Sequence, residues 1–312
     1  ISAINTILDI CEKGSILIIE STVSPGTIDK YIRPEISKRG FVTGRDVHLV
    51  HAPERIIPGN MIYELEHNSR TIGVDDLEIG EKVKDLYSVF CKGEIIITDI
   101  RTAEMTKVVE NTYRDVNIAF ANELAKICRA VNLDVYEIIR IANKHPRVNI
   151  LQPGPGVGGH CISVDPWFLV GDYPDLTNLI LTARKVNDSM PSHVLKRIRD
   201  IMREHKIHDV SKVGLYGLTY KENVDDTRES PTLQLLKRMD EHLAYGVKVF
   251  DPFVKERIVD HQFMNFEDFI NEIEILVIMV AHDHIKDNID LIKDKIILDT
   301  RNICLYEGVY KL

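Results

Sequence analysis

The chain has 312 residues, of which 44% are hydrophobic and 28% are charged, and its formal net charge at pH 7 is −9. This composition is typical of a globular protein long enough for two or three domains. The acidic balance excludes a broad basic surface for nucleic acid or an anionic membrane, although local Lys and Arg can still bind a diphosphate. No run approaches the roughly 18 apolar residues of a membrane span, so no membrane partner is expected.

The five cysteines are scattered along the chain and form no CxxC pair. Their odd number and irregular spacing argue against a disulfide framework. No signal peptide opens the chain, so the pattern predicts a reduced, cytoplasmic setting.

The chain opens on the end of an amphipathic helix over residues 1–12, and short apolar runs then predict a series of strands. Strands are expected at 16–20, 47–51, 70–74 and 94–98, with helices over 25–39 and 75–90. Strands that alternate with helices in this way are typical of a doubly wound α/β sheet. Residues 1–100 are therefore predicted to belong to a Rossmann-like domain.

Residues 101–143 lack strand patterns and predict one long helix. Apolar residues at steps of three and four would form its buried face; they are Met105, Val109, Thr112, Val116, Ala119, Phe120, Leu124, Ile127 and Val131. Residues 144–160 are too rich in Pro and Gly for a helix, and the helical pattern resumes over 176–205. The region 101–205 is therefore predicted to be a helical central domain.

Strands and helices alternate again after Ser211. Strands are expected at 212–216, 247–250, 275–280 and 295–298. This pattern predicts a second Rossmann-like domain over 206–312. The predicted fold class is α/β, with two doubly wound domains joined by a long central helix and a helical region.

The most informative segment is a glycine-rich loop that ends on a cysteine, HPRVNILQPGPGVGGHCISVDPW over residues 145–167. Gly154–Gly159 matches GxGxxG, but no strand precedes it and Pro155 interrupts it, so a dinucleotide-binding turn is rejected. Dense glycines instead let the backbone approach a ligand closely, and a thiol at a helix start gains thiolate character. Cys161 is predicted to be a nucleophile, with Asp165 one helical turn further on. The alternative is an inert buried cysteine.

A second candidate site lies on the predicted long helix. Lys107 and Asn111 are four residues apart and lie off the apolar face. A cation and an amide on one helix face can stabilise a developing oxyanion. The alternative is an ordinary solvated helix face.

Two polar segments follow predicted strands of the first domain. Thr22 lies in ESTVSPGT and Glu54 lies in HAPER. Ligands of open α/β sheets bind at the carboxyl ends of strands, and Glu54 has the chemistry of a general base. The alternatives are helix capping by Ser24, with Pro25 at the first helical position, and a simple loop carboxylate.

Two cationic segments follow strands of the last domain. GLTYKENVDDTRESP, over residues 217–231, places Lys221 and Arg228 where they can bind phosphate groups, ahead of a helix capped by Ser230. Arg301 follows the last predicted strand and adds another cation. Each segment is equally consistent with a solvated turn.

Taken in chain order, these segments resemble the UDP-glucose/GDP-mannose dehydrogenase family over essentially the whole chain. The resemblance implies an NAD-dependent, four-electron oxidation of a UDP-sugar at C6, through a thiohemiacetal and a thioester on Cys161. His160 and Val164 stand where UDP-glucose members carry other residues, which favours an N-acetylhexosamine. UDP-N-acetyl-D-mannosamine is the first expectation, and UDP-N-acetylglucosamine and UDP-glucose are the alternatives.

The resemblance also implies a role for each candidate residue. The catalytic set is Cys161, Lys107 and Asn111 for the oxyanion, Asp165 for proton transfer, and Thr22 and Glu54 for the attacking water. NAD is contacted by Thr22 and Arg228. The substrate is contacted by Gly158, Tyr220, Lys221, Arg301 and, from a neighbouring subunit, Arg147. The active form is expected to be at least a homodimer, and no metal is expected.

One departure from the family concerns the first domain. The strand and the GxGxxG turn that bind the NAD pyrophosphate have no counterpart in residues 1–100. We therefore expect only the C-terminal part of the NAD domain here, and weak NAD binding by this chain. The alternative to an enzyme is a nucleotide-sugar-binding and dimerisation module without activity.

Overall fold

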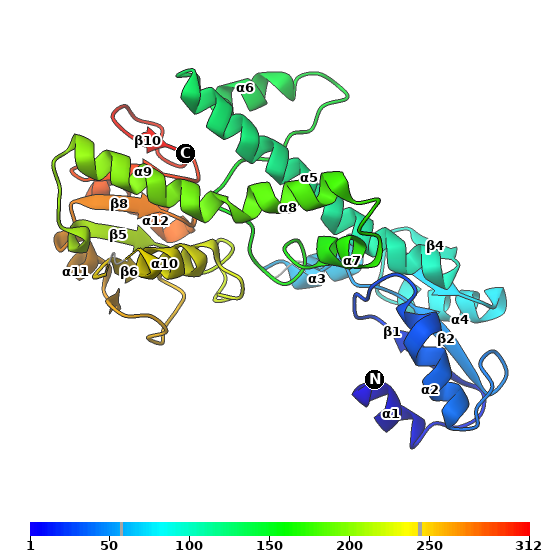
Figure 1. Ribbon diagram of the computed structural model, residues 1–312. Helices are drawn as coiled ribbons and strands as arrows, with labels where there is room; N and C mark the ends of the chain where they lie inside the picture. Colours follow the sequence, from blue (N-terminus) through cyan, green and yellow to red (C-terminus); the bar gives the residue numbers. More distant parts are fainter. Residues whose placement is uncertain (57–58, 243–244) are drawn as a thin grey trace. The chain divides into compact units, whose positions relative to one another are not determined.

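The computed structural model describes residues 1–56, 59–242 and 245–312 (Figure 1). The chain divides into two compact units, and each unit has its own hydrophobic cores. The first unit comprises residues 1–111 and 171–173, and the second comprises residues 112–170 and 174–312. The division into three domains at residues 100 and 205 stays a prediction.

A four-stranded sheet forms the centre of the first unit. Its strands, in spatial order, are β1 (Ser15–Ile19), β2 (Val47–His51), β3 (Arg70–Val74) and β4 (Ile95–Thr98). The pairs β1–β2 and β3–β4 are parallel, whereas β2 and β3 are antiparallel and pair only at Val50 and His51. The α/β prediction is confirmed. The sheet is mixed because strand direction depends on how the chain returns between strands, and an apolar run does not encode that path.

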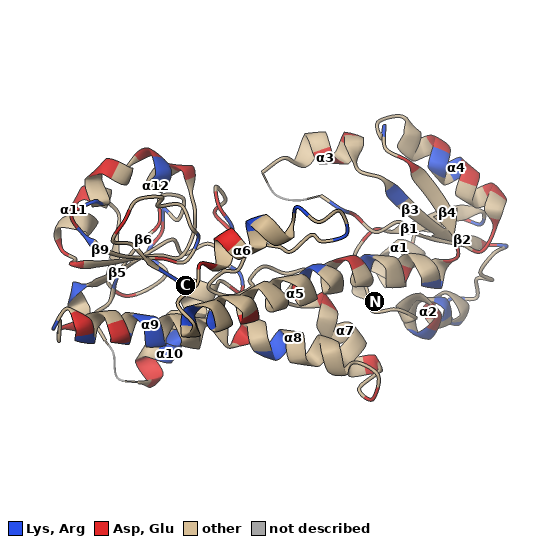
Figure 2. Cartoon of the chain, turned by 90° about the horizontal axis from the view of Figure 1, so that it is seen from above, with Lys and Arg blue, Asp and Glu red and all other residues tan. Residues whose placement is uncertain are grey.

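Alternate residues of β1 and β2 supply two hydrophobic cores in the first unit. Leu17 and Leu49 pack with the N-terminal helices, and Ile18 and Val50 pack with the core that α4 covers. The helices are α1 (Ser2–Leu8), the π-helical turn η1 (Ile28–Ile32), α2 (Arg33–Lys38), α3 (Met61–His67) and α4 (Leu77–Ser88). Charges of both signs lie along the exposed side of α4 (Figure 2).

The helix predicted over residues 25–39 begins later than expected. It starts at Ile28, and no side chain caps it, so the capping role predicted for Ser24 is wrong. The N–H groups of Gly26 and Ile28 instead donate to the Glu104 carboxylate at 2.6 and 2.9 Å. A carboxylate distant in sequence thus binds the amides that a local cap would have bound.

The long helix predicted over residues 101–143 is two helices, α5 (Ile100–Ala130) and α6 (Val135–Ala142). Asn132 has a φ of 56°, a left-handed conformation that ends a helix and that Asn tolerates. The Asp134 side chain then accepts N–H hydrogen bonds from Tyr136 and Glu137 and caps α6. Apolar periodicity continues across the break, which is why the pattern alone joined the two helices.

The buried face of α5 also differs from the predicted one. Several residues of the expected apolar face are at least 47% exposed: Val109, Phe120, Ile127 and Val131. The buried face instead carries polar side chains among small ones, including Asn111, Asp115, Asn122 and Ala125. Polar groups are buried there because the neighbouring helices supply their hydrogen-bond partners.

The helical pattern predicted over 176–205 forms two helices, α8 (Asn178–Asp188) and α9 (Met190–Glu204), and α7 (Asp165–Asp172) precedes them. Arg184 of α8 donates to Asp115 of α5 at 2.6 Å, and Asn187 donates to the same carboxylate at 2.8 Å. Burial raises the pKa of Asp115 although these two partners act in the opposite direction. The network fixes α8 against α5 within the second unit.

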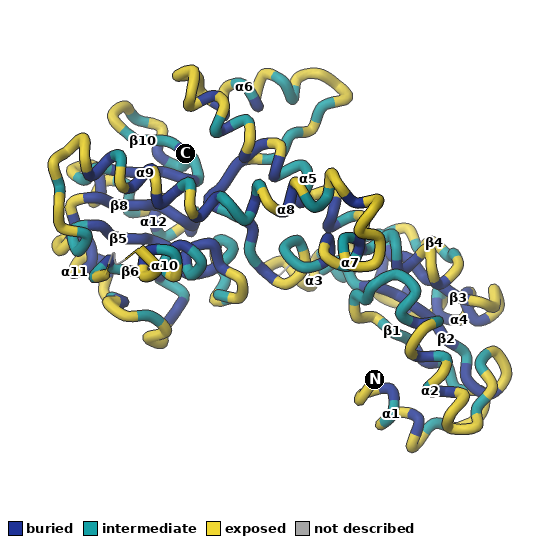
Figure 3. Tube along the Cα trace, in the orientation of Figure 1, coloured by how far each residue is buried: buried dark blue, intermediate teal, exposed yellow. Residues whose placement is uncertain are grey.

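A six-stranded parallel sheet forms the second centre of the chain, and β5 and β8 are buried along their whole length (Figure 3). Its strands, in spatial order, are β10 (Tyr310–Lys311), β9 (Ile296–Asp299), β8 (Ile275–Ile278), β5 (Val213–Tyr216), β6 (Lys248–Phe250) and β7 (Gln262–Phe263). Its helices are α10 (Pro231–Glu241), α11 (Phe266–Asn271) and α12 (Asp283–Asp287). This is the strand order of dinucleotide-binding sheets, in which ligands bind at the carboxyl edge where the order reverses, between β5 and β8.

Candidate active site

The glycine-rich loop is held by amide side chains of the helices before it. The three amides are those of Asn117, Asn122 and Asn143. Asn122 accepts from the Gly154 N–H at 2.8 Å. Asn143 and Ile150 exchange a pair of hydrogen bonds at 2.9 and 2.8 Å. A Gly-rich segment has a large conformational entropy to lose, so these bonds are what give the loop one conformation.

Close packing explains the glycines at the end of this loop. A Cβ atom on Gly158 would lie 2.5 Å from the Glu229 carbonyl oxygen, and one on Gly159 would lie 2.9 Å from the Tyr220 ring. Gly159 also has a φ of 83°, and its N–H donates to the Arg228 carbonyl at 3.0 Å. The loop therefore packs directly on the segment that follows β5. Gly158 and Tyr220, which were both predicted to bind the substrate, are therefore in contact in the structure.

Cys161 stands exposed at the end of the loop. Its carbonyl oxygen accepts the Asp165 N–H at 2.9 Å, so the chain already turns helically there. The helix α7 itself begins at Asp165, which is buried. Cys161 thus lies one turn ahead of the helix rather than at its first residue. Cys161 is therefore not a buried cysteine, and its role as a nucleophile stays a prediction.

Tyr220 and Arg228 of the second unit interact electrostatically with this thiol. Arg228 pairs with Asp226 through two nitrogens, at 2.9 and 2.6 Å, and this pairing raises the pKa of Arg228. Burial raises the pKa of Tyr220, and Asp226 and Cys161 add to that effect. Tyr220 is therefore a neutral hydrogen-bonding group beside the thiol at physiological pH.

The other predicted substrate residues of the second unit lie on neighbouring segments. The Lys221 carbonyl oxygen accepts the Thr219 hydroxyl at 2.8 Å, which ties it to the turn after β5. Arg301 reaches the glycine loop, because its Nη1 would lie 2.9 Å from a Cβ on Gly154. Arg147 is exposed in the same loop, and its action across a subunit boundary stays a prediction.

In the first unit, the segments of Thr22 and Glu54 lie at one edge of the sheet. Ile19 pairs with His51 at the ends of two parallel strands, so the residues that follow emerge at the same edge. Glu54 forms an ion pair with Arg70, and its other oxygen accepts the Arg55 N–H at 2.6 Å. These bonds fix the orientation of the carboxylate that was predicted to act on water.

The helix α5 closes this edge of the first unit and carries Lys107 and Asn111. Glu104 binds the backbone of the loop after Thr22, and Glu110 accepts from Arg55 Nε at 3.0 Å. Lys107 lies between these two carboxylates in sequence, and Asn111 is buried one turn later. The structure therefore places these predicted catalytic residues on segments that are held together within one unit.

Several residues that shape the site were missed from the sequence. They are Asn117 and Asn122, which hold the glycine loop, and Arg70 and Glu104, which hold the polar segments of the first unit. Asn has a poor helix propensity, so an Asn within a long helix was the available signal for the first pair. No sequence signal marks Arg70, because an Arg at a strand start is ordinary.

Comparison with known proteins decides the family. Residues 1–91, 101–189 and 214–305 match the NAD binding, central and UDP binding domains of the UDP-glucose/GDP-mannose dehydrogenase family. A UDP-N-acetyl-D-mannosamine dehydrogenase of Methanocaldococcus jannaschii is 45% identical over 96% of this chain and 69% of that protein. The chain belongs to the UDP-glucose/GDP-mannose dehydrogenase family.

Other relatives of this dehydrogenase chain agree. An NDP-N-acetyl-D-galactosaminuronic acid dehydrogenase of Ralstonia nicotianae is 39% identical over 97% of this chain and 73% of its own length. A solved UDP-N-acetyl-mannosamine dehydrogenase from Staphylococcus aureus is 42% identical, with a TM-score of 0.85 over 99% of this chain and 74% of that one. A UDP-D-ManNAc dehydrogenase from Pyrococcus horikoshii is 36% identical, with a TM-score of 0.90 over 99% and 75%.

These matches confirm the family, the α/β fold class and NAD as the cofactor. Across the described residues, none of the helices combines the length and the apolar character that crossing a membrane requires.

Proposed function

We propose that this dehydrogenase oxidises UDP-N-acetyl-D-mannosamine at C6 to the corresponding uronate. The observation that carries the proposal is the exposed Cys161 at the end of a fixed glycine loop, beside the Tyr220 ring. An accessible thiol can form the covalent intermediates that an alcohol-to-acid oxidation needs. The names of the relatives support the sugar.

NAD, when bound, would accept the hydride that leaves C6 in each of the two oxidations, and the proton that the C6 hydroxyl loses in the first oxidation passes to solvent. The Cys161 thiolate adds to the aldehyde carbon, the carbon–sulfur bond forms, and the carbonyl oxygen takes up a proton. The second oxidation removes that proton and the last hydrogen of C6 and leaves a thioester. Water then adds to the thioester carbon and loses a proton, and the carbon–sulfur bond breaks. The products are the sugar acid and the free Cys161 thiolate.

The other candidate residues serve these steps. Lys107 and Asn111 stabilise negative charge on the reacting oxygen, and Asp165 assists its proton transfer. Glu54, with Thr22, orients the attacking water and takes its proton. The ion pair of Glu54 with Arg70 supports this role, because it fixes the direction of the carboxylate.

Thr22 and Arg228 are the residues that would hold NAD. A hydroxyl at the carboxyl edge of a sheet fits a ribose or an amide of the cofactor. Arg228 is exposed, and Asp226 occupies only part of its guanidinium group, so it fits a phosphate. The donor chemistry of both residues therefore suits the cofactor.

Lys221 and Arg301 would bind the UDP diphosphate, with Tyr220 and Gly158 lining the sugar. The match of residues 214–305 to the UDP binding domain supports this placement. Arg147 would reach the substrate of a neighbouring subunit. The exposed apolar residues of α5 support a homodimer, because exposed apolar surface commonly marks a protein–protein contact. A cytoplasmic location completes the proposal, supported by five cysteines that are all free.

A substrate panel tests this function. NADH formation is measured at an NAD concentration high enough to saturate a weakly bound cofactor, with UDP-N-acetyl-D-mannosamine, UDP-N-acetylglucosamine, UDP-N-acetylgalactosamine and UDP-glucose. The first should give the highest kcat/KM and a yield of two NADH per sugar. A different preferred sugar would replace the substrate and keep the mechanism. Binding of UDP without NADH from any sugar would instead support a binding and dimerisation module.

A further inference from the structure

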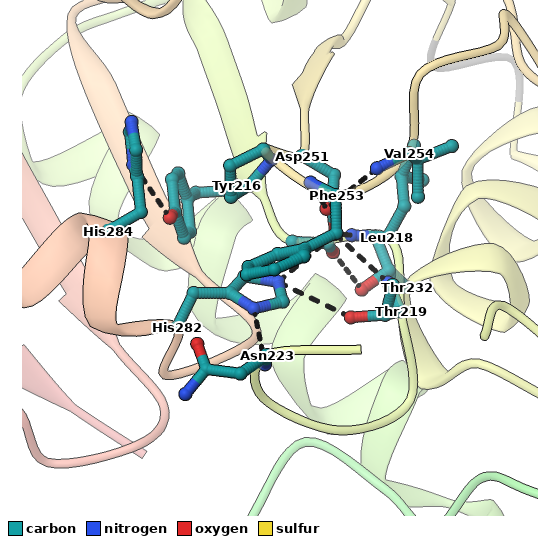
Figure 4. Close-up of polar contacts among 12 residues, drawn as sticks. Tyr216, Leu218, Thr219, Asn223, Thr232, Asp251, Phe253, Val254, His282 and His284 are labelled. Atoms are coloured by element: carbon teal, nitrogen blue, oxygen red, sulfur yellow. Dashed lines mark hydrogen bonds and ion pairs between the residues drawn. The ribbon is translucent and has the colours of Figure 1, made fainter. Parts of the chain in front are cut away.

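A buried carboxylate ends β6 and is fully engaged by backbone amides (Figure 4). One oxygen of Asp251 accepts the N–H groups of Leu218 and Thr219 at 2.6 and 3.2 Å. The other accepts those of Phe253 and Val254 at 2.8 and 3.3 Å. In a dinucleotide-binding sheet, the acid at the end of the second strand binds a ribose. Asp251 holds that position, but its oxygens hold the turn after β5 instead.

A fully buried histidine extends this contact to the far end of the same turn. His282 Nδ1 accepts the Asn223 N–H at 2.9 Å, so the proton of the neutral ring sits on Nε2. Nε2 lies 3.2 Å from Asp251 Oδ2 and 3.3 Å from the Thr219 hydroxyl oxygen. That hydroxyl donates in turn to the Lys221 carbonyl. Figure 4 shows the ring between the two ends of the turn.

Asn223 is a second fixed point of the turn. Its φ of 59° is left-handed, a conformation that Asn tolerates better than most residues and that its hydrogen bonds stabilise here. Its side chain donates to the Asp283 carboxylate at 2.7 Å and accepts the Asp283 N–H at 3.0 Å. The turn from Leu218 to Asn223 is thus anchored at one end by β6 and at the other by the start of α12.

Two of the residues between these anchors, Tyr220 and Lys221, are proposed above to bind the substrate. The Tyr220 ring packs on Gly159 of the glycine-rich loop that ends at Cys161, and the Tyr220 N–H donates to the Asp226 carbonyl at 3.0 Å. Lys221 follows directly. Hydrogen bonds at both ends of the turn, to Asp251 and His282, and the bond from the Thr219 hydroxyl help to fix the position of these two residues.

We propose that Asp251 and His282 are positioning residues that set the affinity of the site for the UDP part of the substrate. The inference rests on the proposed function and deepens it. The pair touches neither the thiol nor the reacting carbon, so it acts through Lys221 and Tyr220. Loss of the anchor raises KM and weakens UDP binding, while kcat at saturation stays close to the wild-type value.

His282→Gln is the main test. A Gln side chain can place its amide near Nε2 and keep the bond to Asp251, but it leaves the Asn223 N–H without its acceptor. KM for UDP-N-acetyl-D-mannosamine should rise about tenfold, and the Kd for UDP by calorimetry should rise by the same factor, because the turn loses the hydrogen bond that holds its far end. The kcat should change by less than about twofold.

His282→Asn should rescue much of the affinity, because its Oδ1 can occupy the position of Nδ1 and accept from Asn223. His284→Gln is the matched control. His284 lies on α12, which begins directly after His282, and its ring bonds the Tyr216 hydroxyl at 3.1 Å rather than the turn. The His284 variant should keep the wild-type KM. Equal KM values for the two Gln variants, or a fall in kcat alone, would overturn the inference.

Thr219→Val decides the question if the His282 variants do not fold. It removes only the hydroxyl that links His282 to the Lys221 carbonyl and keeps nearly the same shape. KM should rise about threefold, on the scale of one lost hydrogen bond. An unchanged KM would count against the inference. If wild type binds no UDP, the proposed function itself fails, so the two failures are distinguishable.

Discussion

The two units support their catalytic candidates in different ways. In the first unit, charged side chains hold the polar segments, through the Glu54–Arg70 pair and through Glu104 on backbone amides. In the second unit, neutral amides and glycine packing hold the thiol loop, through Asn122 and the contact of Gly159 with Tyr220. The first arrangement depends on charge and the second on shape.

This difference suits the chemistry proposed for each part. Groups that stabilise an oxyanion or activate water must carry or balance charge, so charged neighbours orient them. A thiol that attacks a carbon must instead be held at a short distance from it, so the loop needs one conformation. In the second unit, substitutions that change side-chain volume should therefore lower activity most. In the first unit, substitutions that change charge should lower it most.

The largest expected effect is at the thiol. Cys161→Ser should abolish acid formation, because a hydroxyl is not appreciably ionised near neutral pH whereas a thiol readily is. The measurement is NADH formed per UDP-sugar, with Cys11→Ser as a control at a cysteine outside the site. Wild-type turnover of the Ser variant would remove Cys161 from the mechanism.

The next effect tests charge in the first unit. Lys107→Ala should lower kcat by about two to three orders of magnitude, as expected for one lost oxyanion donor, and should change UDP affinity far less. Lys84→Ala removes a lysine from an exposed helix of the same unit and should leave kcat unchanged. A loss confined to KM would make Lys107 a substrate anchor instead.

Shape in the second unit gives a smaller effect. Gly159→Ala adds a methyl group against the Tyr220 ring and should lower kcat/KM by about tenfold to a hundredfold through misplacement of the loop. Gly40→Ala is its control, because Gly40 has a similar φ of 80° and open space around it. Both variants should lose about 1 kcal/mol of stability to the left-handed backbone. Equal activities would show that packing on Tyr220 does not matter.

The smallest effect concerns the pH dependence of stability, in which the two units should behave alike. Burial lowers the pKa of His51 in the first unit and of His193 in the second to about 4, from 6.5. As the pH falls, these histidines take up a proton in the unfolded chain before they do so in the folded protein. Their contribution to the free energy of unfolding is therefore complete above pH 6.5 and decreases as the pH drops towards 4. His51→Leu and His193→Leu should each reduce the difference between urea midpoints near pH 7 and near pH 5. An undiminished difference in both would assign it to carboxylates.

The sequence alone determined the local features of this protein. Apolar runs located the principal strands, and the Pro- and Gly-rich segment located the thiol loop. The Ser230 cap and Pro231 correctly predicted the start of α10. These features depend on neighbouring residues, so a local pattern encodes them. The motifs in order were also enough to indicate the family and its cofactor.

Only the tertiary structure decided which polar groups meet. Asn122 and Asn187 are 65 positions apart and bond on the buried side of α5, where periodicity had predicted the opposite face. Asp251 and His282 meet because β6 and β8 flank β5 in one sheet, and strand order is not written in any single strand. A buried polar side chain is stable only with its partner, and the partner is set by how distant segments pack.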